Sequence, residues 1–271
     1  MRRHFCRFLG LLAGGMLMHA TLAGPIYRVA IVPQQPPATV VRLWEPLLQH
    51  LRGPTGLELR LVTYATIDKF HHAVATGRDD FLYVNPRQYV RAHAVQGYRP
   101  LARERERKLH GVLVVRRDSP IRSARELEGA QIVFPSPTAF AASVLVQSWL
   151  NGQGINFTPV YVRSHDSVYL NVEHGLHPAG GGILRTLDMQ SPDVRNALRV
   201  LVTTAGFTAH AFAVHPRVPE DASAAVREAL LTMETNEAGR AALRRLAIQG
   251  WTRARDADWN DVRQLTTEAS P

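Results

Sequence analysis

The stretch FPSPTAFAAS, residues 134–143, has the residue types of an anion-binding helix terminus. A strand ends at Phe134, prolines follow at positions 135 and 137, and a helix of small residues begins directly afterwards. Proline restricts the backbone and removes an N–H donor, so the two prolines stop the strand. The first N–H groups of the next helix have no partner inside it, and with the helix dipole they can bind an anion. An ordinary βα turn has the same pattern, so both interpretations stay open.

Other polar residues argue against catalysis and against a metal centre. An enzyme would need a nucleophile beside a base, and the only serine next to a His/Asp pair lies in SHDS, residues 164–167. His174 and His177 have a helical spacing that suits a metal ion, but no further ligand is evident at a suitable spacing. We therefore expect no catalytic residues, no metal and no cofactor.

The first 23 residues have the composition of an export signal. They combine a basic start, MRRHFCRF, with the short apolar run LGLLAGGMLM and small residues suited to cleavage after Ala23. A retained membrane anchor is the alternative, but it needs a longer apolar stretch. A lipoprotein would need its cysteine at the cleavage point, whereas Cys6 precedes the apolar run. We therefore expect a periplasmic protein whose mature chain has no cysteine and hence no disulfide.

The charge of the chain does not favour binding to nucleic acid. The formal net charge is +9, and loss of Arg2, Arg3 and Arg7 with the signal leaves 29 basic against 23 acidic residues, or +6. No basic block is interleaved with aromatic residues, and RERERK, residues 103–108, alternates in sign. This pattern is typical of an arginine-rich, solvated surface.

The order of apolar segments predicts an α/β fold. Strands are expected at 27–32, 57–64 and 80–86, and each is followed by a helical pattern. Gly53, Pro54 and Gly56 are expected to stop the first helix. This βαβαβα order is typical of a mostly parallel sheet that is covered on both faces.

A second α/β unit is expected at about 117–203, between two long β-rich runs at 109–121 and 206–219. Its first helix has a capping-box pattern at Ser123 and Glu126. After the second run we expect helical segments only. Two α/β lobes joined by two crossing strands form a clamp that closes on a ligand by hinge motion.

Six segments in the same order and spacing resemble the phosphate/phosphite/phosphonate-type substrate-binding proteins of bacterial ABC importers. No one of them is specific alone; they are VPQQPPATVVRLWEPLLQHL, FLYVNPRQYV, GVLVVRRDSPI, FPSPTAFAAS, SHDSVYLNVEHGL and AGGGILRTL. The resemblance implies a type II periplasmic-binding-protein fold, with a mixed sheet flanked by helices in each lobe and two crossover strands. It further implies a ligand between the lobes and no catalysis. The expected division is a signal at 1–23, lobe 1 at 24–115, lobe 2 at 116–204, and a return to lobe 1 at 205–271.

The resemblance carries over part of the family's binding site. An aromatic residue at a strand end matches Tyr83, with Asn85 beside it, and a histidine that begins a helix matches His165. A helix N-terminus that is often Ser-Thr-Ser matches residues 139–141, and a carboxylate that some members use for an amino group falls near Arg185. These departures disfavour an aminophosphonate and leave an anion plausible, since arginine can bind a phosphoryl group with two hydrogen bonds. The candidate ligand-binding residues are Gln34, Tyr83, Asn85, Ser136, Thr138, Ala139, Phe140, Ala141, His165, Arg185 and His210.

Several of these residues also have a structural interpretation. Tyr83 can simply pack at its strand end, Phe140 can belong to the core, and His165 can be the neighbour of a Ser164 N-cap. The glycines at 180–182 allow a close backbone approach, either to ligand or to a neighbouring helix.

Three functions are consistent with the sequence. The first is a monomeric periplasmic protein that captures a small oxyanion or phosphonate-like anion and delivers it to an ABC permease. The second is a periplasmic sensor that presents its ligand to a membrane histidine kinase. The third, least favoured, is an enzyme on this fold, such as a phosphate or pyrimidine transferase.

Overall fold

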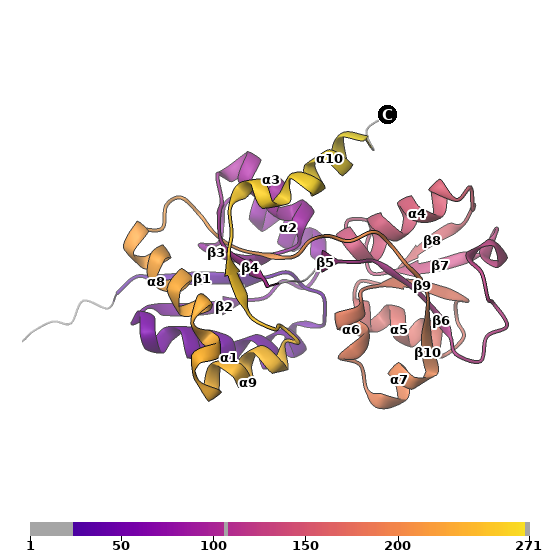
Figure 1. Cartoon of the computed structure of the whole chain (residues 1–271), viewed down its shortest axis with the longest axis horizontal. Coiled ribbons are helices and arrows are strands. Elements are labelled where there is room, and N and C mark those ends of the chain that lie inside the picture. The colour runs from indigo at the N-terminus through magenta and orange to yellow at the C-terminus, as the bar shows by residue number, and fades with distance from the viewer. Residues whose placement is uncertain (1–23, 106–107, 269–271) are drawn as a thin grey trace, which may run out of the picture.

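The computed structural model describes residues 24–105 and 108–268 and contains two α/β lobes that lie side by side (Figure 1). The predicted signal segment lies outside the described residues. One sheet has six strands in the order β13-β4-β12-β3-β1-β2, and the other has five in the order β10-β6-β9-β7-β8. The predicted fold class, with a mixed sheet flanked by helices in each lobe, is confirmed. Within the described ranges, no helix is long and apolar enough to cross a membrane.

The first lobe combines residues from both ends of the chain. Its strands are β1 (Ile26–Ile31), β2 (Glu58–Val62), β3 (Phe81–Val84), β4 (Arg99–Glu104), β12 (Ala211–Val214) and β13 (Trp251–Arg253). Its helices are α1 (Pro37–Thr55), α2 (Ile67–Ala75), α3 (Pro86–Gln96), α8 (Glu220–Leu231), η3 (Met233–Thr235), α9 (Glu237–Arg245), η4 (Asp256–Trp259) and α10 (Asn260–Glu268).

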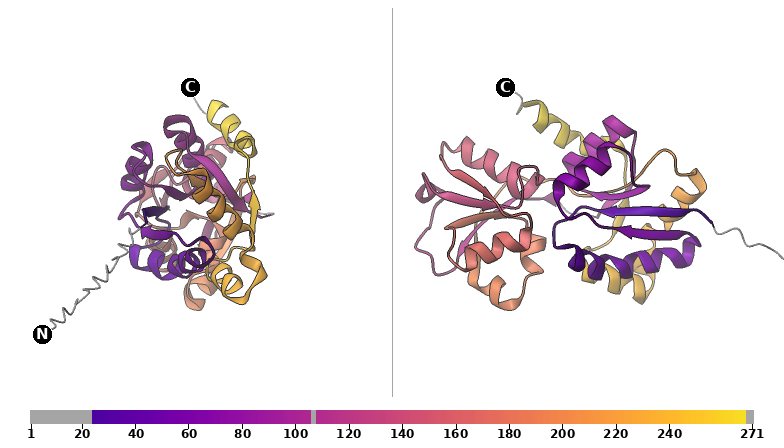
Figure 2. Two further views of the ribbon diagram at one scale, coloured as in Figure 1. Left: turned by 90° about the vertical axis from the view of Figure 1, so that its left-hand side faces the viewer. Right: turned by 180° about the vertical axis from the view of Figure 1, so that it is seen from behind.

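Helices cover both faces of this first sheet. β1 pairs in parallel with β2 and with β3, as the βαβαβα pattern predicts, whereas β12 runs antiparallel to β3 and β4. Helices α1, α8 and α9 pack together on one face, and α2, α3 and α10 lie on the other (Figures 1 and 2).

Two expectations for the first lobe are wrong in detail. Helix α1 continues through Gly53 and Pro54 and ends at Gly56, because only Gly56 takes the left-handed conformation, with φ of 65°. The segment after residue 219 is not purely helical, since β13 pairs with β4 at the sheet edge. β4 itself was not predicted, because its last two residues lie in the charged run RERERK.

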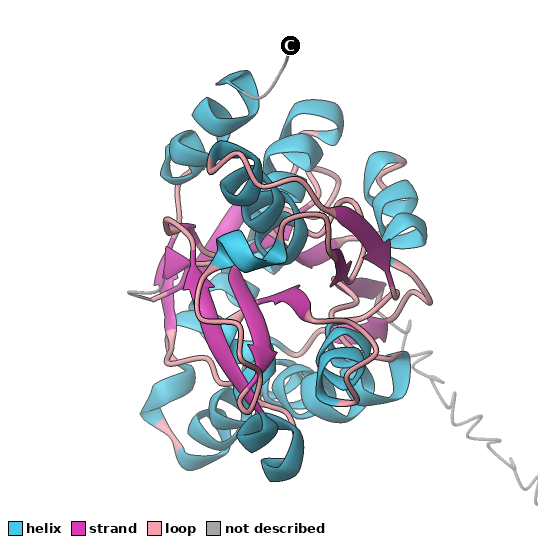
Figure 3. Cartoon of the chain, turned by 90° about the vertical axis from the view of Figure 1, so that its right-hand side faces the viewer, coloured by secondary structure: helices cyan, strands magenta, loops and turns pink. Residues whose placement is uncertain are grey.

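The second lobe is one continuous stretch of chain. Its strands are β6 (Val112–Arg116), β7 (Gln131–Phe134), β8 (Thr158–Tyr161), β9 (Ala179–Gly182) and β10 (Leu198–Thr203). Its helices are η1 (Ala124–Leu127), η2 (Phe140–Leu145), α4 (Val146–Gly152), α5 (His165–Glu173), α6 (Leu184–Asp188) and α7 (Pro192–Ala197). Apolar residues of η1 and α4 pack on one face of the sheet, and those of α5, α6 and α7 pack on the other (Figure 3).

The glycines of β9 make room for neighbouring elements of their own lobe. A Cβ atom on Gly181 would lie 2.1 Å from the Ala142 carbonyl oxygen, and one on Gly180 would lie 2.6 Å from the Val168 side chain. Gly111, just before β6, is equally tight, because its Cβ would lie 2.2 Å from the Ala141 carbonyl oxygen. Among the described residues, therefore, these glycines serve helix packing, and they seat the start of η2 directly on the sheet.

Each long β-rich run is broken between the lobes. The first divides into β5 (Lys108–Leu109) and β6, and the second into β11 (Phe207–Thr208) and β12. β5 and β11 pair with each other in an antiparallel two-stranded ribbon, while β6 belongs to the second sheet and β12 to the first. The two crossovers are therefore joined to each other at the point where the chain passes between lobes.

Candidate functional site

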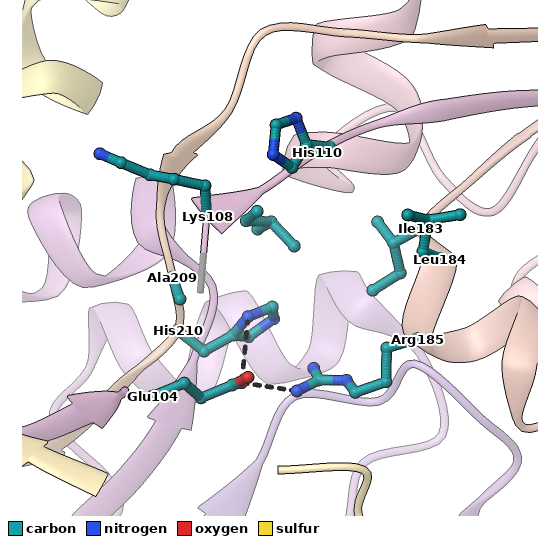
Figure 4. A pocket seen from close by; sticks show the side chains of 9 residues that line it. Glu104, Lys108, His110, Ile183, Leu184, Arg185, Ala209 and His210 are labelled. Carbon is teal, nitrogen blue, oxygen red and sulfur yellow. Dashed lines mark hydrogen bonds and ion pairs between the residues drawn. The ribbon is translucent and has the colours of Figure 1, made fainter. Parts of the chain in front are cut away.

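Two small adjoining pockets lie between the lobes. The first, of about 50 Å³, is lined by Glu104, Lys108, Leu109, His110, Ile183, Leu184, Arg185, Ala209 and His210 (Figure 4). The second, of about 20 Å³, shares Leu109, Ile183 and His210 with it and adds Val32, Gln34, Ile67, Asn85, Ala139, Phe140, Ala141, Ala142 and His165. Volumes of this size hold only a few water molecules. The lobes are therefore closed on each other, and a larger ligand needs them to separate.

A buried ion pair joins the lobes beside the first pocket. Arg185 of α6 donates from Nη1 to Oε1 of Glu104 on β4 at 2.5 Å, and its Nη2 donates to Gln34 Oε1 at 3.3 Å. The side chains of Arg185 and Glu104 are 8% and 3% exposed. Burial alone would raise the pKa of Glu104, but Arg185, His210 and the Tyr83 hydroxyl hold it below its usual value. Glu104 is therefore ionised, and the positive charge of Arg185 is already balanced.

Tyr83 contacts Glu104 of this ion pair and is not among the residues that line either pocket. Its hydroxyl donates to Oε1 of Glu104, and its ring stacks on His210 with centroids 4.9 Å apart and an angle of 8° between the planes. Trp44 also packs against Tyr83, with ring centroids 4.3 Å apart. Tyr83 is only 1% exposed, so in this closed form it positions Glu104 and His210.

The second pocket is lined by polar groups from both lobes. The His165 backbone N–H donates to the carbonyl oxygen of Gln34 at 3.1 Å, which joins the start of α5 to the first lobe. The amide nitrogen of Gln34 lies 3.1 Å from Nε2 of His210. Burial, and next the positive charge of Arg185, lower the pKa of His165 to about 3. His165 is therefore neutral at pH 7, and Ser164 caps its helix through Ser167 N–H, as its position suggested.

The helix start predicted at FPSPTAFAAS borders this second pocket. η2 is a π-helical turn that continues directly into α4, and the carbonyl oxygen of Ala139 accepts from both Ser143 N–H and Val144 N–H. The first N–H groups, those of residues 140–142, have no acceptor inside the helix. Phe140 also packs against Phe207 of β11 with centroids 5.7 Å apart. Both interpretations of Phe140, core residue and pocket wall, therefore hold in part.

Thr138 is not the N-cap of this helix, because Ala139 occupies that position and makes no side-chain hydrogen bond. Ser136 Oγ lies 3.3 Å from Thr138 Oγ1 and accepts from Thr138 N–H at 3.3 Å, so the two hydroxyl groups are occupied with each other. Neither residue is among those lining the two interlobe pockets. Thr138 instead borders a pocket between α2 and α3.

Glu104 is the site residue that the sequence analysis missed. It lies in the charged run that was interpreted as solvated surface, yet it is 2% exposed. Ala102, two residues earlier on β4, is also fully buried, so both side chains lie on the same buried face of the strand. That alternation, together with recognition of β4, is the signal that could have identified Glu104.

The depressed pKa of His165 gives an expected pH dependence of stability. The unfolded chain protonates His165 near pH 6.5 and the folded chain only near pH 3, so the unfolded state binds more protons between these values. Its contribution to the free energy of unfolding is therefore full above about pH 6.5 and falls by about 2 kcal/mol by about pH 5. We expect chemical denaturation to show a steeper loss of stability over this range for the wild type than for His165→Gln. Equal slopes in the two proteins would contradict the assignment.

Two α/β lobes, two crossovers and a polar site enclosed between the lobes define a periplasmic binding protein of type II. The chain belongs to the family described as "ABC transporter, phosphonate, periplasmic substrate-binding protein", whose model matches residues 29–259. Its function is therefore that of a periplasmic solute-binding protein for an ABC importer of the phosphonate class. The family match gives no support to the sensor alternative, and this family is not one of enzymes.

Solved structures with low sequence identity share the fold. A binding-protein component of an ABC phosphonate transporter from Pseudomonas aeruginosa is 12% identical, with a TM-score of 0.81 over 89% of this chain and 85% of that one. PhnD1 from Prochlorococcus marinus, in complex with methylphosphonate, is 13% identical, with a TM-score of 0.83 over 90% and 97% of the two chains. A Xanthomonas citri protein bound to chloride ion is 18% identical, with a TM-score of 0.73 over 89% and 96%.

Proposed function

We propose that this protein, a monomer exported by a cleavable signal, binds a small phosphonate-like anion in the second interlobe pocket and carries it to an ABC permease without chemical change. This proposal rests on one observation: both lobes contribute polar groups to that pocket. The N–H groups of residues 140–142 come from the second lobe, and Gln34, Asn85 and His210 come from the first. A ligand held by both lobes stabilises their closed arrangement.

Most of the donors that this pocket offers are backbone and amide N–H groups. Arg185 is balanced by Glu104, and His165 carries no charge at pH 7. The oxygen of the Asn85 side chain accepts from Gln88 N–H at 2.9 Å, which leaves the NH2 group of Asn85 as a donor. Backbone N–H groups at a helix start, amide groups and imidazole suit a compact anion with several oxygen acceptors. The proposed ligand class is therefore a small phosphonate, phosphite or phosphate.

The proposal is tested by titrating the mature protein with methylphosphonate, phosphite, phosphate and, as a sulfur-centred control, methanesulfonate. A true ligand at 100 times its dissociation constant should add about 2.7 kcal/mol to the free energy of unfolding. We also expect it to decrease the radius of gyration in solution scattering, because the lobes close about the β5–β11 ribbon. Binding of none of these phosphorus anions, or binding without a change in scattering, would contradict the proposed site between the lobes.

A further inference from the structure

A third pocket, of about 320 Å³, lies between α2 and α3 and is much larger than the two interlobe pockets. The two helices pack side by side on one face of the first sheet (Figure 1). Val74, Ala75 and Ala92 supply an apolar part of its lining. Thr138 of the second lobe also borders it, so the pocket is complete only when the lobes are closed as they are here.

Positive charge gathers at this α2–α3 pocket. Arg87 and Arg91 both line it, and they stand one turn apart on the same side of α3. In the described part of the chain neither guanidinium forms an ion pair with an acidic residue, although most other arginines of the first lobe do. The positive charges of Arg91 and Arg87, together with burial, lower the pKa of His71, and the carboxylate of Asp68 acts in the opposite direction. Two cations therefore remain for an anionic occupant.

Polar atoms without partners also lie at this pocket. Gln88 lines it and is 6% exposed, yet neither the nitrogen nor the oxygen of its amide has a hydrogen-bond partner among the described residues. The same holds for Nε2 of His71. A buried polar group without a hydrogen-bond partner destabilises the folded protein. A ligand that brings a polar head group to Gln88 recovers that cost.

We propose that the α2–α3 pocket is a second binding site, which takes a small organic anion with a short apolar chain. The acidic head lies between Arg87 and Arg91, with Gln88 as a neutral partner, and the chain lies on Val74, Ala75 and Ala92. This site is separate from the interlobe pockets, with which it shares no lining residue. It follows from thermodynamic linkage that its occupant favours the closed lobes, because Thr138 forms part of the wall.

Hexanoate is the probe for this proposal, because its chain is apolar and its head is a carboxylate rather than a phosphonate. We expect hexanoate at millimolar concentration to shift the NMR signals of α2 and α3 backbone amides. The same shifts should occur in Ala141→Asp, in which the interlobe site is blocked, but at higher hexanoate concentration, because that variant favours open lobes. Hexylammonium and hexan-1-ol have the same number of carbon atoms without the negative charge and should produce much smaller shifts.

The double variant Arg87→Gln/Arg91→Gln should weaken hexanoate binding about tenfold or more. Its titration with methylphosphonate should remain close to that of the wild type. Arg42→Gln/Arg60→Gln is the matched control, because it removes the same charge from two exposed arginines away from the pocket. The proposal is overturned if hexanoate causes no shifts in α2 and α3, if hexylammonium acts equally well, or if both double variants bind hexanoate alike.

Discussion

The variant Ala141→Asp is expected to fold normally and to lose binding of methylphosphonate. Ala141 lines the second interlobe pocket and is only 4% exposed, so an aspartate there places a carboxylate where the anion is proposed to lie. Juxtaposition of like charges at a closed interface costs several kcal/mol. The fold is spared because an acidic residue in the first turn of a helix is mildly stabilising, and because opening of the lobes lets water reach the new carboxylate.

Melting temperature and ligand titration on this variant give a clear decision. Ala141→Asn is the matched control, because it has the size of aspartate without the charge and should retain part of the affinity. Retained binding in Ala141→Asp would show that FPSPTAFAAS is only a turn. Unfolding of the variant would show that Ala141 is a core residue.

Arg185→Ala is expected to weaken binding of the same anion by about 1.5 to 3 kcal/mol, the range for a hydrogen bond to a charged group. The structure gives this effect a specific cause. Without the guanidinium, the carboxylate of Glu104 remains beside the pocket as a buried negative charge with no balancing cation. The ion pair between the two lobes is also lost. Calorimetry at neutral pH measures the change, and wild-type affinity in a folded Arg185→Ala protein would contradict it.

The double variant Arg185→Ala/Glu104→Gln separates two roles of Arg185. If Arg185 acts by balancing Glu104, as its 2.5 Å contact indicates, removal of both charges restores most of the affinity. If Arg185 binds the ligand itself, the double variant stays as weak as Arg185→Ala. Glu104→Gln alone serves as the reference that completes the cycle.

Local patterns predicted the elements that depend on near neighbours. The alternating strands and helices of the first lobe, the second α/β unit and the Ser164 cap all follow from residues close in sequence. β4 and β13 were not predicted because they form strands only through long-range pairing. β4 pairs with β12 and with β13, each of which lies more than a hundred residues later in the chain. The charged side chains of β4 obscured the weak alternation of Ala102 and Glu104.

For the candidate site, too, the sequence predicted local features but not contacts between distant residues. The helix start at residues 139–141 and the positions of His165 and Gln34 at the pocket were within reach of the sequence and the family resemblance. The pairing of Arg185 with Glu104 joins residues 81 apart on different lobes, so no local pattern reveals it. The π-helical turn at Phe140 also has no local signature, and it displaced the expected cap from Thr138 to Ala139.

The interrupted first sheet has a consequence for the order of folding. β12 lies between β3 and β4, so these two strands have no partner on that side until the chain beyond residue 210 is present. The second lobe has no such dependence, because its ends, Val112 and Thr203, are direct strand partners within one uninterrupted segment. Its contacts are of lower sequence separation, and contacts of that kind form faster. The second lobe can therefore assemble as an autonomous unit while the first still awaits its central strand, and a chain truncated after residue 203 would retain one complete lobe and one open sheet.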